Sequence, residues 1–218
     1  YGYVIPEAQK VYQEHRDNAG VQAIIGFCTG DTEALRQQVA ADEFPFVSGS
    51  LSENLKDVKE SPYNFLVAAS YSDQGRALLK WIKDNHEGGE PTVALLYNDT
   101  AFGRSPVEDM KAYAKEIGVK VVDEQVIDVK ATEAQSQLLN MEKKNPDYGI
   151  IQQTWAATST ILRDSKTLGI DTKYMGLNWT TGEGLLDNVD AATAEGFMGI
   201  LLNADPTEDV PGMAEVKE

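Results

Sequence analysis

The sequence predicts an α/β fold with parallel sheets and helices on both faces of the sheets. Short apolar runs alternate with helical stretches along the chain, and each run is continuously apolar rather than alternating. Continuous runs are typical of strands that are buried on both faces, and the intervening helices are the crossovers that parallel strands require. About seven strands are predicted in this way.

The early part of the chain contains two predicted helices and two predicted strands. Residues 6–18 begin with a proline and continue with helical spacing, and residues 31–41 begin with acids that suit the positive end of a helix. Residues 21–27 and 44–50 are the predicted strands. Proline and serines interrupt residues 61–73, which are compatible with a strand that feeds a crossover between two domains.

The alternation is clearer in the rest of the chain. Gly118 and Gly169 follow two of the helical stretches, as expected for residues that end a helix. Strands are predicted at residues 92–97, 119–127, 148–153, 173–178 and 195–203, and helices at residues 73–86, 105–117, 132–144 and 156–168.

The net charge argues against a nucleic-acid partner, and the hydropathy argues against a membrane-spanning helix. The 218 residues include 35 acidic and 19 basic side chains, which gives a net charge of -16. Such a chain repels phosphate backbones, and it has no basic patch with interleaved aromatic residues, so a nucleic-acid partner is not expected. No apolar run approaches the roughly 20 residues of a membrane-spanning helix, so no direct membrane span is predicted.

The sequence lacks the motifs of a metal site or an enzyme. Cys28 is the only cysteine, and His15 and His86 lie far apart, so no zinc-binding cluster is predicted. The dinucleotide, phosphate-loop and nucleophile-elbow motifs are also missing. Cys28 is better explained as a small buried residue than as a nucleophile paired with His15. We therefore expect no cofactor, no metal and no catalytic residues.

The loops after the predicted strands are the expected ligand site, because ligands bind beyond the carboxyl ends of parallel strands. These loops contain hydroxyls that can hold a carboxylate and aromatic rings that can enclose an apolar body. Each of the candidate residues in these loops also has a structural interpretation. It can cap a helix, make an exposed loop polar, pack in a core, form a hydrophobic staple or occupy a turn. The residues concerned are Thr29, Gly30, Thr32, Ser48, Ser50, Ser52, Phe102, Trp155, Asn178 and Trp179.

Several segments resemble the type I periplasmic binding proteins. The most specific are AIIGFCTGDTEAL, FPFVSGSLSENL, VALLYNDTAFGRS and DYGIIQQTWAATSTILRDSKTLGI, and YSDQGRALLKWI and KYMGLNW also match. They occur in the family's order across essentially the whole chain. The likeness is strongest to the branch that binds leucine, isoleucine and valine.

The resemblance implies two α/β lobes with a ligand in the cleft between them. Residues 1–70 would be a partial first lobe without its first strand and helix, residues 71–203 the second lobe, and residues 204–218 the start of the crossover back. Residues 61–70 and 204–206 would be hinges. The protein would be a non-enzymatic receptor that delivers a branched-chain or other hydrophobic amino acid, or an analogue, to the membrane permease of an ABC importer. A ligand-sensing regulatory or receptor domain of the same fold is the alternative.

The resemblance also implies a location and the absence of one disulfide. The receptor would be periplasmic, or extracellular and lipid-anchored through a segment upstream of residue 1. Cys28 matches a position that forms a disulfide in some relatives. The partner position holds Tyr3, so that disulfide is not expected.

The site residues follow from the same resemblance. Thr29, with the neighbouring N–H group of Gly30, would hold the ligand's carboxylate, and Ser50 and Leu51 would add hydroxyl and backbone contacts. Tyr71, at the crossing into the second lobe, completes this side of the predicted site.

Three further positions depart from the family pattern. Phe102 replaces one pocket tyrosine, Thr154 or Trp155 stands at another, and Asn178 replaces a glutamate that pairs with the ligand's ammonium. Since a buried ammonium without a counter-charge is costly, either Asp31 takes over this role or the ligand is not a standard amino acid.

Overall fold

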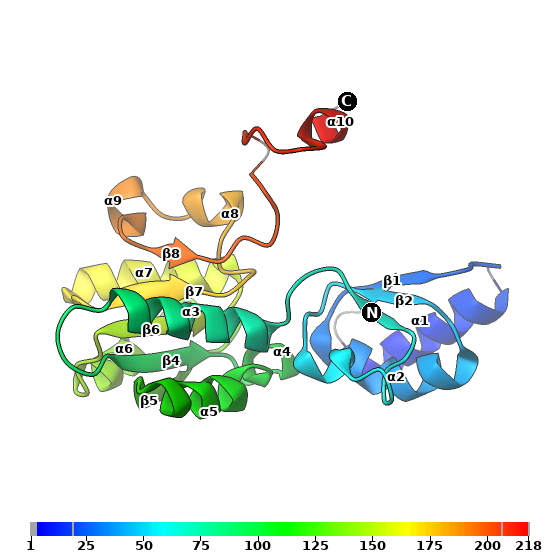
Figure 1. The fold of residues 1–218 in the computed structure, drawn as a ribbon, viewed down its shortest axis with the longest axis horizontal. Coiled ribbons are helices and arrows are strands. Elements are labelled where there is room, and N and C mark those ends of the chain that lie inside the picture. The colour runs from blue at the N-terminus through cyan, green and yellow to red at the C-terminus, as the bar shows by residue number, and fades with distance from the viewer. Residues whose placement is uncertain (1–3, 19, 206, 218) are drawn as a thin grey trace.

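The computed structural model describes residues 4–18, 20–205 and 207–217, and it contains two separate sheets, shown side by side in Figure 1. The strand order is β1-β2-β3 in one sheet and β5-β4-β6-β7-β8 in the other. All paired strands are parallel. The predicted α/β fold with parallel sheets is confirmed, and the five strands predicted in the later part of the chain lie in one sheet.

Two helices cover one face of the three-stranded sheet. Phe46 of the central strand is buried against Tyr12, Leu35 and Val39 from these helices. Gly26 makes room for Phe46, because a Cβ atom at Gly26 would lie 2.3 Å from the Phe46 ring. The elements are α1 (Ile5–Asn18), β1 (Ile24–Gly26), α2 (Thr29–Asp42), β2 (Phe46–Ser48), the 3₁₀ helix η1 (Glu53–Lys56) and β3 (Asn64–Leu66).

The opposite face of this sheet carries exposed apolar side chains. The strand register places Ile25, Val47 and Phe65 in one row across the three strands. Ile25 is 85% exposed and Phe65 is 49% exposed. Within the described residues, this sheet is thus covered on the helical face only.

The five-stranded sheet is covered on both faces. Its strands are β4 (Thr92–Tyr97), β5 (Lys120–Val126), β6 (Tyr148–Gln152), β7 (Lys173–Gly176) and β8 (Met198–Gly199). The helices of this part are α3 (Tyr71–Asn85), α4 (Ala101–Arg104), α5 (Val107–Ile117), α6 (Gln135–Glu142), α7 (Trp155–Leu168), α8 (Glu183–Leu186) and α9 (Ala191–Ala194), followed by α10 (Met213–Lys217).

Successive residues of the interior strand β4 enter two different cores. Val93 and Leu95 pack with residues of α3 and α5, whereas Ala94 and Leu96 pack with residues of α6 and α7. All four side chains are fully buried. The strand is therefore continuously apolar because it separates two helical layers.

Several predicted elements differ from the structure in their bounds. The helix predicted at residues 105–117 is α5, which begins two residues later because Pro106 is its N-cap, and the separate short helix α4 precedes it. Helix α6 starts later than predicted, since the Asp164 carboxylate accepts the Ala134 N–H at 2.6 Å and holds the preceding turn. The strand predicted at residues 195–203 is limited to β8, because its partner β7 ends at Gly176.

Several features of the chain bear on the functional class. No helix in the three described ranges is long and apolar enough to cross a lipid bilayer. Among the same residues, no group of three or more His, Cys, Asp or Glu side chains is placed to hold a metal ion. Cys28 has a free thiol. Tyr3 stands at the position of the disulfide partner in some relatives, and Pro206 belongs to a predicted hinge. Both lie outside the described residues.

Candidate functional site

Two buried hydroxyls meet where β1 and β2 end. Thr29 is the first residue of α2, and Thr29 and Ser50 are 2% and 1% exposed. The Ser50 hydroxyl donates a hydrogen bond to the Thr29 hydroxyl oxygen at 2.7 Å. This pair lies at the N-terminus of a 14-residue helix, where the helix dipole favours a negative charge.

Helix α2 begins two residues earlier than predicted, so Thr29 and Gly30 lie within its first turn. Cys28 is the N-cap residue. Burial raises the pKa of the Cys28 thiol, while hydrogen bonds from the nearby backbone N–H groups act in the opposite direction. Gly30 faces α4, because a Cβ atom there would lie 3.8 Å from the Ala101 Cβ.

The serine-rich loop is fixed by its own side chains. The Ser48 hydroxyl lies 2.9 Å from the Thr32 hydroxyl and accepts the Ser50 N–H at 2.8 Å. Ser52 donates to the Glu33 carboxylate at 2.5 Å. The loop polarity seen in the sequence therefore supports the backbone around Ser50, which places the Ser50 hydroxyl beside Thr29.

Tyr71 connects this loop to the second sheet. Its N–H donates to the Leu51 carbonyl at 2.8 Å, and its ring packs edge-on against Phe102 with centroids 5.3 Å apart. The Tyr71 hydroxyl accepts a hydrogen bond from the Trp179 indole N–H at 3.0 Å. Burial raises the pKa of Tyr71, although hydrogen bonds, including those of Trp179 and Thr29, act in the opposite direction. Residues from four predicted loops are thus brought together.

Trp155 lies in a different environment from the other aromatic residues. It is the first residue of α7, is 41% exposed and packs against Gly184 of α8. A Cβ atom at Gly184 would lie 2.9 Å from the Trp155 ring. Thr154 is the N-cap of α7. The contacts of Trp155 are therefore with α8, whereas Phe102 contacts Tyr71.

A network of buried side-chain amides, which was not predicted from the sequence, lies at the ends of β4 and β6. The Asn98 amide N–H donates to Gln153 at 2.9 Å, and Gln153 donates to the Ile127 carbonyl at 2.8 Å. Gln152 donates to the Phe102 carbonyl at 3.0 Å, and its own amide oxygen has no partner. In the sequence, this network is indicated only by Gln152 and Gln153, two consecutive glutamines at the end of an apolar strand.

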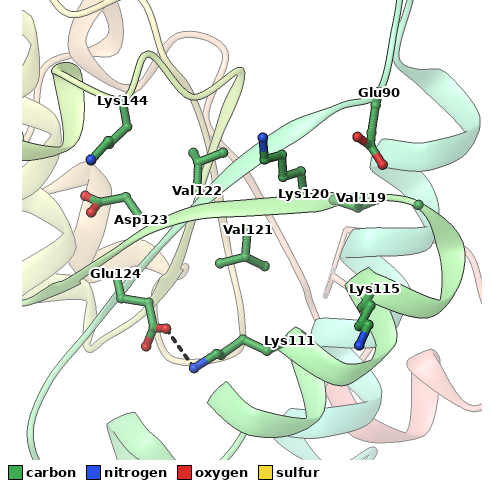
Figure 2. A pocket seen from close by; sticks show the side chains of 11 residues that line it. Glu90, Lys111, Lys115, Val119, Lys120, Val121, Val122, Asp123, Glu124 and Lys144 are labelled. Atoms are coloured by element: carbon green, nitrogen blue, oxygen red, sulfur yellow. Dashed lines mark ion pairs between the residues drawn. The ribbon is translucent and has the colours of Figure 1, made fainter.

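Two surface cavities lie away from these residues. One cavity, of about 780 Å³, lies along β5. Lysines such as Lys111, Lys115 and Lys120 flank it (Figure 2). Strand β5 is an edge strand with a register irregularity opposite Val93 and Ala94, and charges and bulges of this kind protect an edge from pairing with other chains. A second cavity, of about 630 Å³, lies where β6 and β7 begin. Neither contains a candidate residue.

Comparison with known proteins places the fold in a family. A family model described as "Periplasmic binding protein" matches residues 1–214. The chain belongs to this family. No curated protein sequence matched the chain in a separate comparison.

Solved structures of periplasmic binding proteins share this architecture. A branched-chain amino acid ABC transporter protein from Thermus thermophilus with bound valine is 28% identical, with a TM-score of 0.91 over 99% of this chain and 56% of that chain. An ABC transporter substrate-binding protein from Aeropyrum pernix is 30% identical, with a TM-score of 0.90 over 100% of this chain and 56% of that chain. A fatty acid ABC transporter substrate-binding protein from Thermomonospora curvata is 20% identical, with a TM-score of 0.87 over 99% and 55%. The chain thus spans about half the length of these binding proteins.

Proposed function

We propose that this periplasmic binding protein is the extracytoplasmic receptor of an ABC importer. It captures a small solute with a carboxylate and an apolar body and delivers it to a membrane permease, without catalysing a reaction. The Thr29–Ser50 pair at the start of α2 is the observation that carries the proposal. Buried hydroxyls at a helix N-terminus are suited to a carboxylate, and a carboxylate is common to amino acids and fatty acids.

We infer that the ligand lies between two lobes, residues 1–70 and 71–203, with residues 204–218 leading back towards the first. The separate sheets support this division. Near the candidate site, the two parts are close to each other, with the Ser105 hydroxyl 3.2 Å from the Ser52 hydroxyl. We therefore propose that residues after β1, β2, β4 and β7 line the ligand site.

The ligand we favour is a branched-chain or aromatic amino acid or an analogue of one. The binding protein from Thermus thermophilus was solved with valine, and it is similar to this chain over nearly all of its length. Asn178 supplies an amide where the leucine-type pattern has a carboxylate. Asp31 is buried beside Thr29, where its carboxylate accepts the Thr32 N–H at 2.9 Å, and it is the alternative partner for an ammonium.

Replacement of Thr29 tests the carboxylate site. We expect Thr29→Ala in the full-length protein to weaken ligand binding by about 1–3 kcal/mol, because a hydrogen bond to a charged group is lost. Thr29→Ser keeps the hydroxyl and should bind nearly as tightly as the wild type. Isothermal titration calorimetry measures both. An unchanged isotherm for Thr29→Ala would remove Thr29 from the site.

Replacement of Asn178 tests ligand charge. We expect Asn178→Glu to strengthen binding of α-amino acids by about 1–3 kcal/mol and to weaken binding of ligands without an ammonium, because it adds a counter-charge. Asn178→Gln, which adds length without charge, should not distinguish the two classes. Leucine binding that is tight, is lost on deamination and is indifferent to Asn178→Glu would assign the counter-charge to another residue, such as Asp31.

A further inference from the structure

The turn after β7 holds a tryptophan in a backbone conformation that side chains disfavour. The Thr180 N–H donates to the Leu177 carbonyl at 3.2 Å, which closes a four-residue turn with Trp179 in third place. Trp179 has a φ of 75°. The third residue of a type II turn has this φ and favours glycine or asparagine, and a bulky residue there is a genuine outlier. Asn178, which tolerates the conformation better, lies one position too early.

The neighbours of Trp179 impose this conformation. Thr180 is fully buried and also donates its hydroxyl to the Leu177 carbonyl at 2.6 Å. It occupies space left by Gly176, where a Cβ atom would lie 2.0 Å from the Thr180 hydroxyl oxygen. The Asn178 N–H donates to the buried Gln74 side chain at 2.8 Å. Since the turn is anchored on both sides of Trp179, its shape does not depend on the indole.

The indole points towards the Thr29–Ser50 pair. Its N–H donates to the Tyr71 hydroxyl at 3.0 Å, and the Tyr71 N–H in turn donates to the carbonyl of Leu51, the residue after Ser50, at 2.8 Å. Its ring lies 6.1 Å from the Phe27 ring, at an interplanar angle of 59°. Phe27 follows β1 and Trp179 follows β7, so the contact joins the two parts of the chain. Trp179 nevertheless remains 39% exposed.

We propose that Trp179 is a specificity-determining residue whose indole receives the apolar body of the ligand. This inference rests on the proposed function, in which Thr29 and Ser50 hold the ligand's carboxylate. Glycine would suit the backbone of this turn better than tryptophan. The presence of tryptophan is therefore explained by a role of its side chain. A flat indole face favours ligands with a planar apolar body, because aromatic rings stack on one another. The preferred class is therefore a carboxylate with an aromatic body.

The test compares Trp179→Gly, Trp179→Phe and the wild type in the full-length protein. Calorimetry is performed with phenylalanine and leucine and with their deaminated analogues, phenylpyruvate and 4-methyl-2-oxopentanoate. We expect Trp179→Gly to weaken binding of the aromatic ligands about tenfold or more and of the aliphatic ligands less, with an intermediate loss for Trp179→Phe. Trp81→Phe, on the outer surface of α3, is the matched control and should leave all affinities unchanged.

Thermal unfolding separates this role from a structural one. Trp179→Gly should melt close to Trp179→Phe, because relief of the positive φ offsets the loss of the ring contacts. A melting temperature well below that of Trp179→Phe would make Trp179 a packing residue and overturn the inference. Equal losses for both ligand classes, or none, would also overturn it while leaving the receptor function intact. A wild type that binds no member of the panel contradicts the proposed amino-acid ligand class, and the inference then fails with it.

Discussion

Gly103→Ala is expected to destabilise the protein by about 3 kcal/mol, as overpacking at a rigid contact does. A Cβ atom at Gly103 would lie 2.1 Å from the Asn98 backbone oxygen and 2.6 Å from its side-chain oxygen. The contact is rigid because Asn98 is buried and its amide donates to Gln153. Helix α4 must then move and shift Phe102 relative to Tyr71. Urea unfolding of the full-length protein measures the loss.

Gly89→Ala is the matched control for Gly103→Ala. A Cβ atom at Gly89 would have no neighbour within 4 Å, and its φ lies outside the left-handed region. We expect a change within about 0.5 kcal/mol, as for other exposed positions. Similar effects of the two substitutions would contradict the close packing described for α4.

Gln153→Leu is expected to cost about 2–4 kcal/mol, because it leaves two buried polar groups unpaired. These are the Asn98 amide N–H, which donates to Gln153, and the Ile127 carbonyl, which accepts from it. Leucine fills a similar volume, so the loss arises from hydrogen bonding rather than from a cavity. Thermal and urea unfolding both report it.

The adjacent Gln152→Leu provides a control of the same size. Gln152 makes one hydrogen bond, to the Phe102 carbonyl, and its buried amide oxygen has no partner. Losing that bond while removing an unsatisfied acceptor should cost less than about 1 kcal/mol. An equal cost for Gln152→Leu and Gln153→Leu would show that the amide network does not stabilise the fold as described.

Most of the architecture was predictable from local pattern. The run at residues 92–97 coincides with β4 because both faces of this strand are buried. Gly118 and Gly169 end α5 and α7 with a φ of 70°, as their positions predicted. The prediction failed where distant residues decide the boundaries. Asp164 sets the start of α6, and the length of β7 limits β8.

The candidate site was predictable in kind but not in arrangement. Hydroxyls at the strand ends identified Thr29 and Ser50, because parallel strands bring their carboxyl ends to one edge. The Tyr71–Trp179 contact joins residues that are 108 positions apart, and the positive φ of Trp179 follows from its buried neighbours. No single-sequence pattern reports either feature. The sequence pattern also does not indicate that Trp155 lies apart from the other aromatic residues.

Calorimetric titration of the full-length protein with paired carboxylates and carboxamides tests whether the Thr29–Ser50 pair at the start of α2 holds the carboxylate of a ligand with an apolar body. We expect leucine or phenylalanine, or a deaminated analogue, to bind with one-to-one stoichiometry. The corresponding amide should bind about tenfold more weakly or worse, because the carboxylate's charge-assisted hydrogen bonds are lost. Equal affinity for an acid and its amide, or no binding by any acid of the panel, would contradict this role of the pair.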